Sequence, residues 1–430
     1  MSNEKTEETH KKMMENREDT GVIPVDLPEQ ELATTSRQVT GPIHPAQPLP
    51  KSRYSLPKFY GPTNRSFLFY GVAALLLSIG IAGILIMLST LLSQGVSVAL
   101  PIILLAGIPV VVILFFIIWI DSWEPEPFIL YAVSFVWGAG VATLLSLIST
   151  DLFGVTVAQV IRIDDKDFLQ TVVAAPFMEE LSKGVGLILL IVLYAKNFNG
   201  PVDGIVYGML IGLGFAFTEN VVYFGVYHDE LADVFRVRAI LNPFVHPLAT
   251  AMMGAVMGLS MQRHSRKTLA YLLPTGLLAA FVIHALHNYS ATLKMSDSTR
   301  LVFQVPIYLV AIGVILMARL SERREVMSAL YEYAHAGWLT KNELLMIQTL
   351  SNRRNARLWA GENVQKSGGD PDDGIKAMTE FQSELIQLGY MRSRNLHHET
   401  VNDPESRAEE AERLDKLKQL RKVFTSRKIR

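Results

Sequence analysis

The chain has 430 residues, of which 50% are hydrophobic and 19% charged, and its formal net charge is -1. Such a balanced charge gives no indication of a nucleic-acid partner. The chain has no cysteine, which excludes disulfides, thiolate zinc ligands, a cysteine nucleophile and palmitoylation. Several apolar runs reach about twenty residues, the length that crosses a hydrocarbon core of ~30 Å. The sequence therefore predicts an all-α, polytopic transmembrane helical bundle.

Residues 1–65 precede the first apolar run. Most of this segment is polar, rich in proline and almost free of aromatic residues, so it cannot bury enough apolar surface to fold. We predict a disordered cytoplasmic tail. The first apolar run begins near Ser66, too far along the chain for a cleavable signal peptide.

A transmembrane domain is predicted over residues 66–320. It contains eight apolar segments that we expect to span the membrane: 66–93, 97–120, 128–150, 168–195, 203–227, 239–261, 269–292 and 301–319.

Basic residues at the ends of these segments predict the orientation, because lysine and arginine concentrate on the cytoplasmic side. Eleven lie at the ends that share a face with the N-terminus, and six lie at the opposite ends: Arg162, Lys166, Arg236, Arg238, Lys294 and Arg300. This bias places both termini in the cytoplasm. One span more or fewer would reverse the C-terminus.

Residues 321–430 are predicted to form a cytoplasmic helical region. Val326, Leu330 and Tyr333 fit a helical stripe, and a capping-box pattern follows at Thr340 and Glu343. Segments 374–390 and 404–424 also have the composition of helices. No catalytic or nucleotide-binding motif is visible, so this region is expected to serve in packing or in docking a cytoplasmic partner.

Four consecutive spans, the fourth to the seventh, carry polar residues where lipid should forbid them. An ionised group at membrane depth costs at least ~3 kcal/mol, so such residues are seldom present without a function. The residues, in chain order, are Glu179, Glu180, Lys183, Glu219, Asn220, His246, His284, His287 and Asn288.

Helix geometry predicts that these residues meet. Counted from the face shared by the four spans, five of them lie in one layer about 10–18 Å deep, at 1.5 Å per residue: Glu179, Glu180, Glu219, His246 and His284. Gly204, Gly208 and Gly212 form a small-residue stripe that permits close helix packing. Glu219 lies within about 20° of this stripe, at 100° per residue, and so points into the helix contact.

Each element also has a simpler interpretation. Glu179 and Lys183 could form an internal ion pair, His246 between two prolines could be structural, and His284, His287 and Asn288 could join helices by hydrogen bonds. Their coincidence at one depth favours an assembled site. A proton- or ion-coupled transporter using the same carboxylates is the main alternative, and an inactive scaffold that recruits partners through the C-terminal helices is another.

Carboxylates and histidines without cysteine suit the activation of water. Glu219, His246 and His284 could bind a zinc ion, with Glu179 or Glu180 as the base. In a metal-free version, a glutamate and Glu219 would share a proton while His284 and Asn288 donate to the oxyanion. Because Lys183 is i,i+4 from Glu179, we expect those two to pair and favour Glu180 as the base.

Four motifs resemble those of the PrsW family of intramembrane proteases: Glu179-Glu180-x-x-Lys183, Phe215-x-x-x-Glu219 with Asn220, His246 with Gly254, and His284-x-x-x-Asn288. The turn from Asp121 to Pro127 is similar to the Glu-Pro-Glu-Pro connection of that family. Lys183 and Glu219 depart from the pattern of the related CAAX-prenyl endopeptidases and bacterial Abi proteins.

The resemblance covers roughly residues 115–320. It implies an intramembrane endopeptidase, usually labelled a metalloprotease, that hydrolyses a membrane-protein substrate such as an anti-sigma factor. It also implies catalytic roles for Glu179, Glu180, Glu219, His284 and Asn288. Whether a metal is required stays open.

Overall fold

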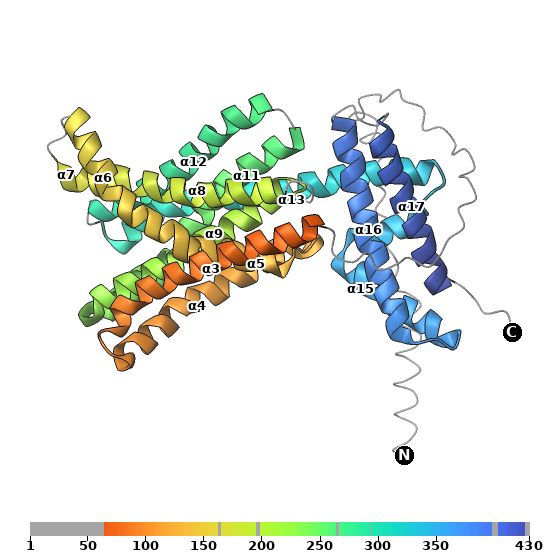
Figure 1. Ribbon diagram of the computed structural model, residues 1–430, viewed down its shortest axis with the longest axis horizontal. Helices are drawn as coiled ribbons and strands as arrows, with labels where there is room; N and C mark the ends of the chain where they lie inside the picture. The colour runs from red at the N-terminus through yellow and green to blue at the C-terminus, as the bar shows by residue number, and fades with distance from the viewer. Residues whose placement is uncertain are drawn as a thin grey trace, which may run out of the picture. The chain divides into compact units, whose positions relative to one another are not determined.

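The computed structural model describes residues 64–161, 165–194, 198–263, 266–293, 295–397 and 403–425, and within these ranges all regular structure is helical (Figure 1). The predicted tail lies outside these ranges except for its last two residues, which begin the first helix. The all-α prediction is confirmed.

The elements of the membrane part are α3 (Asn64–Leu92), α4 (Val96–Ile120), η1 (Asp121–Trp123), α5 (Phe128–Val136), η2 (Trp137–Ala142), α6 (Thr143–Ile161), α7 (Lys166–Phe168), η3 (Leu169–Ala174), α8 (Ala175–Leu193), α9 (Pro201–Val226), η4 (His228–Glu230), α10 (Leu231–Phe235), η5 (Arg236–Leu241), α11 (Val245–Arg263) and α12 (Arg266–Thr292). The C-terminal elements are α13 (Asp297–His335), α14 (Lys341–Gln348), α15 (Leu350–Lys366), α16 (Pro371–His397) and α17 (Pro404–Thr425).

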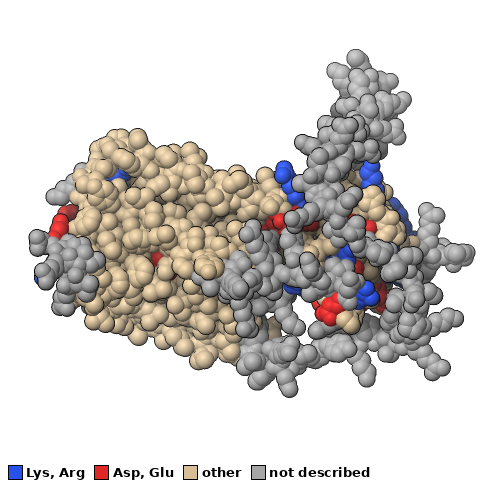
Figure 2. Space-filling view, turned by 90° about the horizontal axis from the view of Figure 1, so that it is seen from above, with Lys and Arg blue, Asp and Glu red and all other residues tan. Residues whose placement is uncertain are grey.

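Seven helical segments of the described chain are long and apolar enough to cross a membrane: Tyr70–Leu92, Val96–Trp123, Phe128–Val157, Pro201–Val226, His228–Ser260, Tyr271–Thr292 and Asp297–His335. Figure 2 shows a broad surface with few charged side chains, which gather toward its ends. The eighth expected span corresponds to η3 and α8. It is helical but more polar, because Glu179, Glu180 and Lys183 fall in any stretch of it long enough to span.

A hydrogen bond agrees with the prediction that α8 crosses the bundle, although α8 is not among the seven apolar segments. The side-chain amide of Asn199, just after α8, donates to Glu124 Oε1 over 3.1 Å. Glu124 lies just before α5, so the two residues are at the same face. The chain leaves that face through α5, η2 and α6, and only α8 can bring it back. Together with the seven apolar segments, this gives the eight predicted crossings.

The glycine stripe of α9 packs directly on the backbone of α11. A Cβ atom added to Gly204 would lie 2.0 Å from the carbonyl oxygen of Gly254, and one added to Gly208 would lie 2.4 Å from that of Thr250. At Gly212 the nearest atom would be the carbonyl oxygen of His246, also at 2.4 Å. Only glycine fits at such distances, and the close approach sets Glu219 opposite His246.

Replacing Gly208 with leucine is expected to disrupt this contact. The new side chain would meet backbone atoms that cannot rotate away, so we expect destabilisation of at least ~1–3 kcal/mol. Thermal unfolding in detergent, followed by circular dichroism, measures the loss. Gly313→Leu in α13 is the matched control, because no atom lies within 4 Å of a Cβ at that position. Equal stability of the two variants would contradict the packing argument.

The C-terminal helices attach to the turn before α5. The indole of Trp123 donates to the carbonyl oxygen of Ile347 over 3.3 Å, and Gln387 in α16 donates to Glu124. Burial raises the pKa of Glu126 to about 7 and that of Glu124 well above its ordinary value, so protonation helps this acidic turn to tolerate burial. Helix α13 runs without a break through the expected domain boundary at residue 320.

Three π-helical turns, η2, η3 and η5, interrupt the helices around the polar layer. The carbonyl oxygen of Ala139 in η2 accepts from Thr218 over 2.6 Å, and that of Thr171 in η3 accepts from Asn288 over 2.9 Å. The third turn, η5, carries Arg238, which contacts Glu219. Such turns redirect side chains within a helix and are common at functional sites.

Candidate active site

Six ionisable side chains from four helices meet inside the membrane part. Four of them line a pocket of about 580 Å³, and the other two lie buried behind it. The six are Glu179, Glu180 and Lys183 of α8, Glu219 of α9, His246 of α11 and His284 of α12. The prediction that these residues converge is confirmed by their contacts.

Glu180 has no exposed surface, and three side chains contact its carboxylate. Its Oε1 lies 2.7 Å from Lys183 Nζ and 3.0 Å from His284 Nδ1, and its Oε2 accepts from the hydroxyl of Thr250 over 3.1 Å. The expected ion pair of Lys183 with Glu179 is present at 3.9 Å, but Glu180 is the closer partner of the lysine. Thr250 and His284 hold Glu180 in place from neighbouring helices. Lys183 pairs with the carboxylate in this position.

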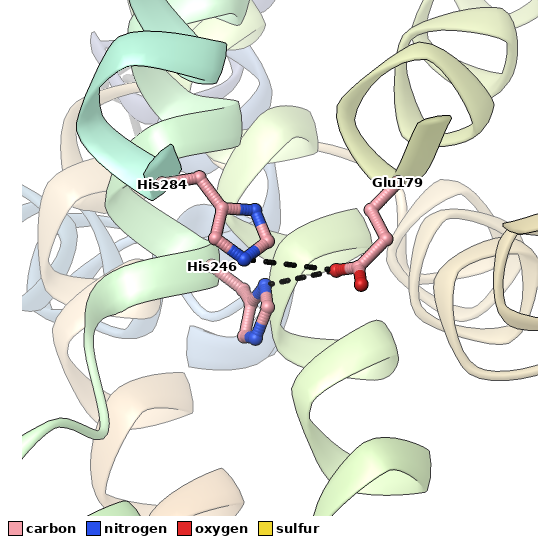
Figure 3. A group of neighbouring side chains, drawn as sticks. All are labelled: Glu179, His246 and His284. Carbon is pink, nitrogen blue, oxygen red and sulfur yellow. Dashed lines mark ion pairs between the residues drawn. The ribbon is translucent and has the colours of Figure 1, made fainter. Parts of the chain in front are cut away.

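Glu179 is the carboxylate that faces the pocket. Its Oε2 atom is buried and has no hydrogen-bond partner within the described part of the chain. His284 Nε2 lies 3.7 Å from this oxygen and His246 Nδ1 lies 4.0 Å from it (Figure 3). Buried polar atoms are nearly always paired in proteins, so this oxygen is available for a ligand.

The hydrogen-bond partners of each histidine determine which ring nitrogen carries the proton. Lys183 Nζ lies 2.9 Å from His246 Nδ1, and an ammonium can only donate, so Nδ1 accepts and Nε2 carries the proton. That proton is donated to Glu219 Oε2 over 2.6 Å. In His284, the carboxylate of Glu180 holds the proton on Nδ1, which leaves Nε2 directed toward Glu179. Each imidazole thus has one nitrogen fixed by a carboxylate and the other facing Glu179.

The donor set suits a metal ion. Ligand atoms of Glu179, His246 and His284 all lie within 4.8 Å of one another. A glutamate with two histidines is a common zinc set, and a carboxylate on the outer nitrogen of each histidine is the usual supporting contact. The carboxylate grouped with the histidines is Glu179, whereas the sequence suggested Glu219. A metal bound at His246 Nδ1 would require Lys183 to release that nitrogen.

Arg238 is a site residue that the sequence did not reveal. Its Nη2 lies 2.5 Å from Glu219 Oε2, its Nε donates to Asn220 Oδ1 over 2.8 Å, and its guanidinium carbon lies 4.1 Å from the ring centre of Tyr223. The sequence places Arg238 among the charges outside the membrane. No spacing to the other polar residues marks it, because η5 belongs to a separate turn before α11.

We expect Arg238→Ala to reduce activity at least tenfold, because Glu219 would lose the cation that orients it against His246. Arg238→Lys should restore part of the rate, since it keeps the charge but loses the second hydrogen bond. The measurement is the dependence of kcat on pH for both variants. Unchanged kcat and an unchanged pH profile in Arg238→Ala would contradict this role.

The remaining predicted residues lie at the edge of the site. Asn288 lines the pocket but donates to the carbonyl oxygen of Thr171 over 2.9 Å, so it touches none of the central carboxylates or histidines. Asn220 is held by Arg238. His287 also lines the pocket, and its Nδ1 accepts from the amide of Gln304 over 2.6 Å.

Known proteins with a similar sequence share this region. Residues 126–317 match the family model of PrsW family intramembrane metalloproteases. The Protease PrsW of Oceanobacillus iheyensis is 29% identical over 169 residues, which cover 37% of this chain and 70% of that protein. Those of Clostridioides difficile and Bacillus subtilis are each 31% identical, over 158 residues (36% of this chain, 64% of the relative) and 139 residues (32% and 59%). No solved structure matches the chain significantly.

The helical bundle and its buried carboxylate–histidine site are those of a membrane-embedded hydrolase. The matched region and the three relatives make the identification more specific. Over residues 126–317, less than half of its length, the chain is similar to the PrsW family of intramembrane metalloproteases, and this similarity supports a peptidase of the membrane.

Proposed function

We propose that this protein hydrolyses a peptide bond of a membrane-protein substrate, with Glu179 as the general base. The observation that carries the proposal is the buried Oε2 of Glu179, which lies within 4.0 Å of both histidines, has no hydrogen-bond partner among the described residues and belongs to a side chain that lines the pocket. Glu180, favoured by the sequence, is committed to Lys183, His284 and Thr250 and has no access to the pocket.

In this mechanism Glu179 takes a proton from water as the water attacks the substrate carbonyl, and later gives that proton to the leaving amine. Glu180 and Lys183 hold His284 and His246 in place, and Arg238 with Glu219 fixes His246 from the other side. Asn288 reaches the oxyanion after releasing the carbonyl oxygen of Thr171. Pre-oriented donors of this kind stabilise the tetrahedral intermediate.

In a metal-dependent alternative, Glu179, His246 and His284 would hold a zinc ion, which would polarise the substrate carbonyl and lower the pKa of water, and Glu179 would then be a ligand and not the base. We expect one zinc per chain in protein purified without chelators, and loss of that zinc in His284→Ala. Elemental analysis by mass spectrometry measures the stoichiometry. His287→Ala is the control that should retain the metal. Full activity after thorough chelation would contradict a zinc-dependent mechanism.

The charge bias of the sequence favours a substrate approached from the non-cytoplasmic side. With both termini in the cytoplasm, the pocket lies in the half of the membrane away from them. A single-span protein with an exposed segment at that depth, such as an anti-sigma factor, suits this geometry. Cysteine accessibility is a direct test, because the chain has no cysteine of its own.

The test of function is quantitative proteomics of membrane-protein fragments in cells with wild-type protein or Glu179→Gln. The proposal expects a small set of fragments that disappear in the variant, and these name the substrate. Identical fragment profiles would contradict it. The comparisons give no support to a transporter, and proton flux in liposomes that depends on Glu219, without proteolysis, would be required to revive that alternative.

A further inference from the structure

A second pocket lies beside the active site, between α12 and α13. Its volume is about 160 Å³. Val245, His287 and Ser290 line both this pocket and the active-site pocket, so the two cavities share a wall. Anything bound in the second pocket therefore lies next to the active-site pocket.

The lining is mostly apolar, but two of its residues each carry a buried polar atom that has no hydrogen bond within the described residues. Gln304 is only 3% exposed; its Nε2 donates to His287 Nδ1, while its Oε1 has no hydrogen bond within the described residues. The hydroxyl of Tyr308, four residues further along α13, is likewise buried and unpaired among the residues described. Leaving such atoms unpaired costs about 1–3 kcal/mol each, so the pocket favours a ligand that brings a hydrogen-bond donor.

We propose that this pocket receives the side chain of a substrate residue adjacent to the scissile bond, and that its preferred occupant is tyrosine. This inference rests on the proposed peptidase function and names its specificity. An apolar cavity of ~150 Å³ is known to hold a benzene ring, so the pocket has room for a phenol. The phenolic hydroxyl donates to Gln304 Oε1 and accepts from Tyr308, which pairs both buried atoms.

A lipid acyl chain is the competing occupant. Leu286 and Phe303 line the pocket and are 48% and 56% exposed, so one side of the cavity is open toward the apolar surface of the protein. An acyl chain has no donor for Gln304 and would leave both polar atoms unpaired. The position of the pocket against His287 also places it where a peptide in the active site would project a side chain.

The first test is cleavage of a proteome-derived peptide library by the full-length protein in detergent, with the cut sites read by mass spectrometry. Wild type should prefer tyrosine over alanine at one position flanking the cut. Ile307→Phe, which fills the pocket, should reduce that preference at least about tenfold while cleavage beside alanine stays within twofold. Tyr308→Phe should lower the preference for tyrosine over phenylalanine. Val302→Phe, on the exposed face of α13, is the matched control and should behave as wild type.

The outcomes separate the two proposals. Cleavage by wild type with a preference that Ile307→Phe leaves unchanged would overturn the pocket assignment and leave the peptidase function intact. Absence of cleavage by wild type would count against the function instead.

A binding measurement tests the pocket without catalysis. Met295 lines the cavity, so its labelled methyl group should shift in the NMR spectrum when N-acetyltyrosinamide is added to wild type, but not to Ile307→Phe. If the Met295 methyl group shows contacts with lipid and its signal does not shift when N-acetyltyrosinamide is added, the pocket holds an acyl chain.

Discussion

Replacing Glu179 with glutamine is expected to lower the rate of peptide-bond hydrolysis by ~10²–10⁴-fold, the range typical of a lost general base. Glutamine has nearly the same size and keeps an oxygen directed toward the pocket, but it cannot accept the proton of water. The side chain makes no hydrogen bond through Oε2 and is 14% exposed, so the fold should tolerate the change. Cleavage of a co-reconstituted substrate, with thermal unfolding as the control for folding, measures the effect.

Glu180→Gln gives the contrast. It should also abolish cleavage, but through loss of stability, because Lys183 and His284 would lose their charged partner in the interior. The two variants thus separate by their unfolding temperatures. If Glu179→Gln were fully active and a folded Glu180→Gln variant were not, the assignment of the base would have to be exchanged.

The second large effect is expected for Lys183→Met, which should destabilise the protein by ~3–5 kcal/mol. Lys183 and Glu180 both have no exposed surface, and their charged atoms lie 2.7 Å apart. Removing the lysine leaves a buried carboxylate without its cation and takes a donor from His246. Reversible unfolding in mixed micelles gives the free energy of unfolding.

The double variant Lys183→Met/Glu180→Gln tests whether this loss comes from the uncompensated charge. With both charges removed, we expect the double variant to be more stable than Lys183→Met, with a coupling energy of ~0.5–3 kcal/mol. If the losses in free energy of unfolding of the two single variants simply add in the double variant, the two side chains act independently. That result would contradict the contact between them. Catalysis should remain absent, since neither histidine would be held as it is in wild type.

These predictions rest on a division of labour between adjacent glutamates. The helix turns about 100° per residue, so the two side chains leave α8 in different directions. The side chain of Glu180 contacts Thr250 and His284 and has a structural role. The side chain of Glu179 lines the pocket. A pair of carboxylates at one point of a helix can thus supply both a fixed anion and a free base.

The sequence by itself determined the architecture and the six central members of the site, but not Arg238. Apolar length predicted the spans, and the constant rise and rotation of a helix predicted that Glu219, His246 and His284 lie at one depth and that the stripe from Gly204 to Gly212 packs closely. These properties depend on one helix at a time, and they can therefore be read from residue spacing.

Only the tertiary structure decided the roles within the site. Lys183 can reach a partner at i−3 or i−4, and its choice of Glu180 depends on Thr250 and His284, which approach from other helices. Arg238 enters from a separate turn, and the pocket beside His287 exists only where α12 meets α13. Contacts between segments distant in the chain set these features, and no periodicity in a single segment encodes them.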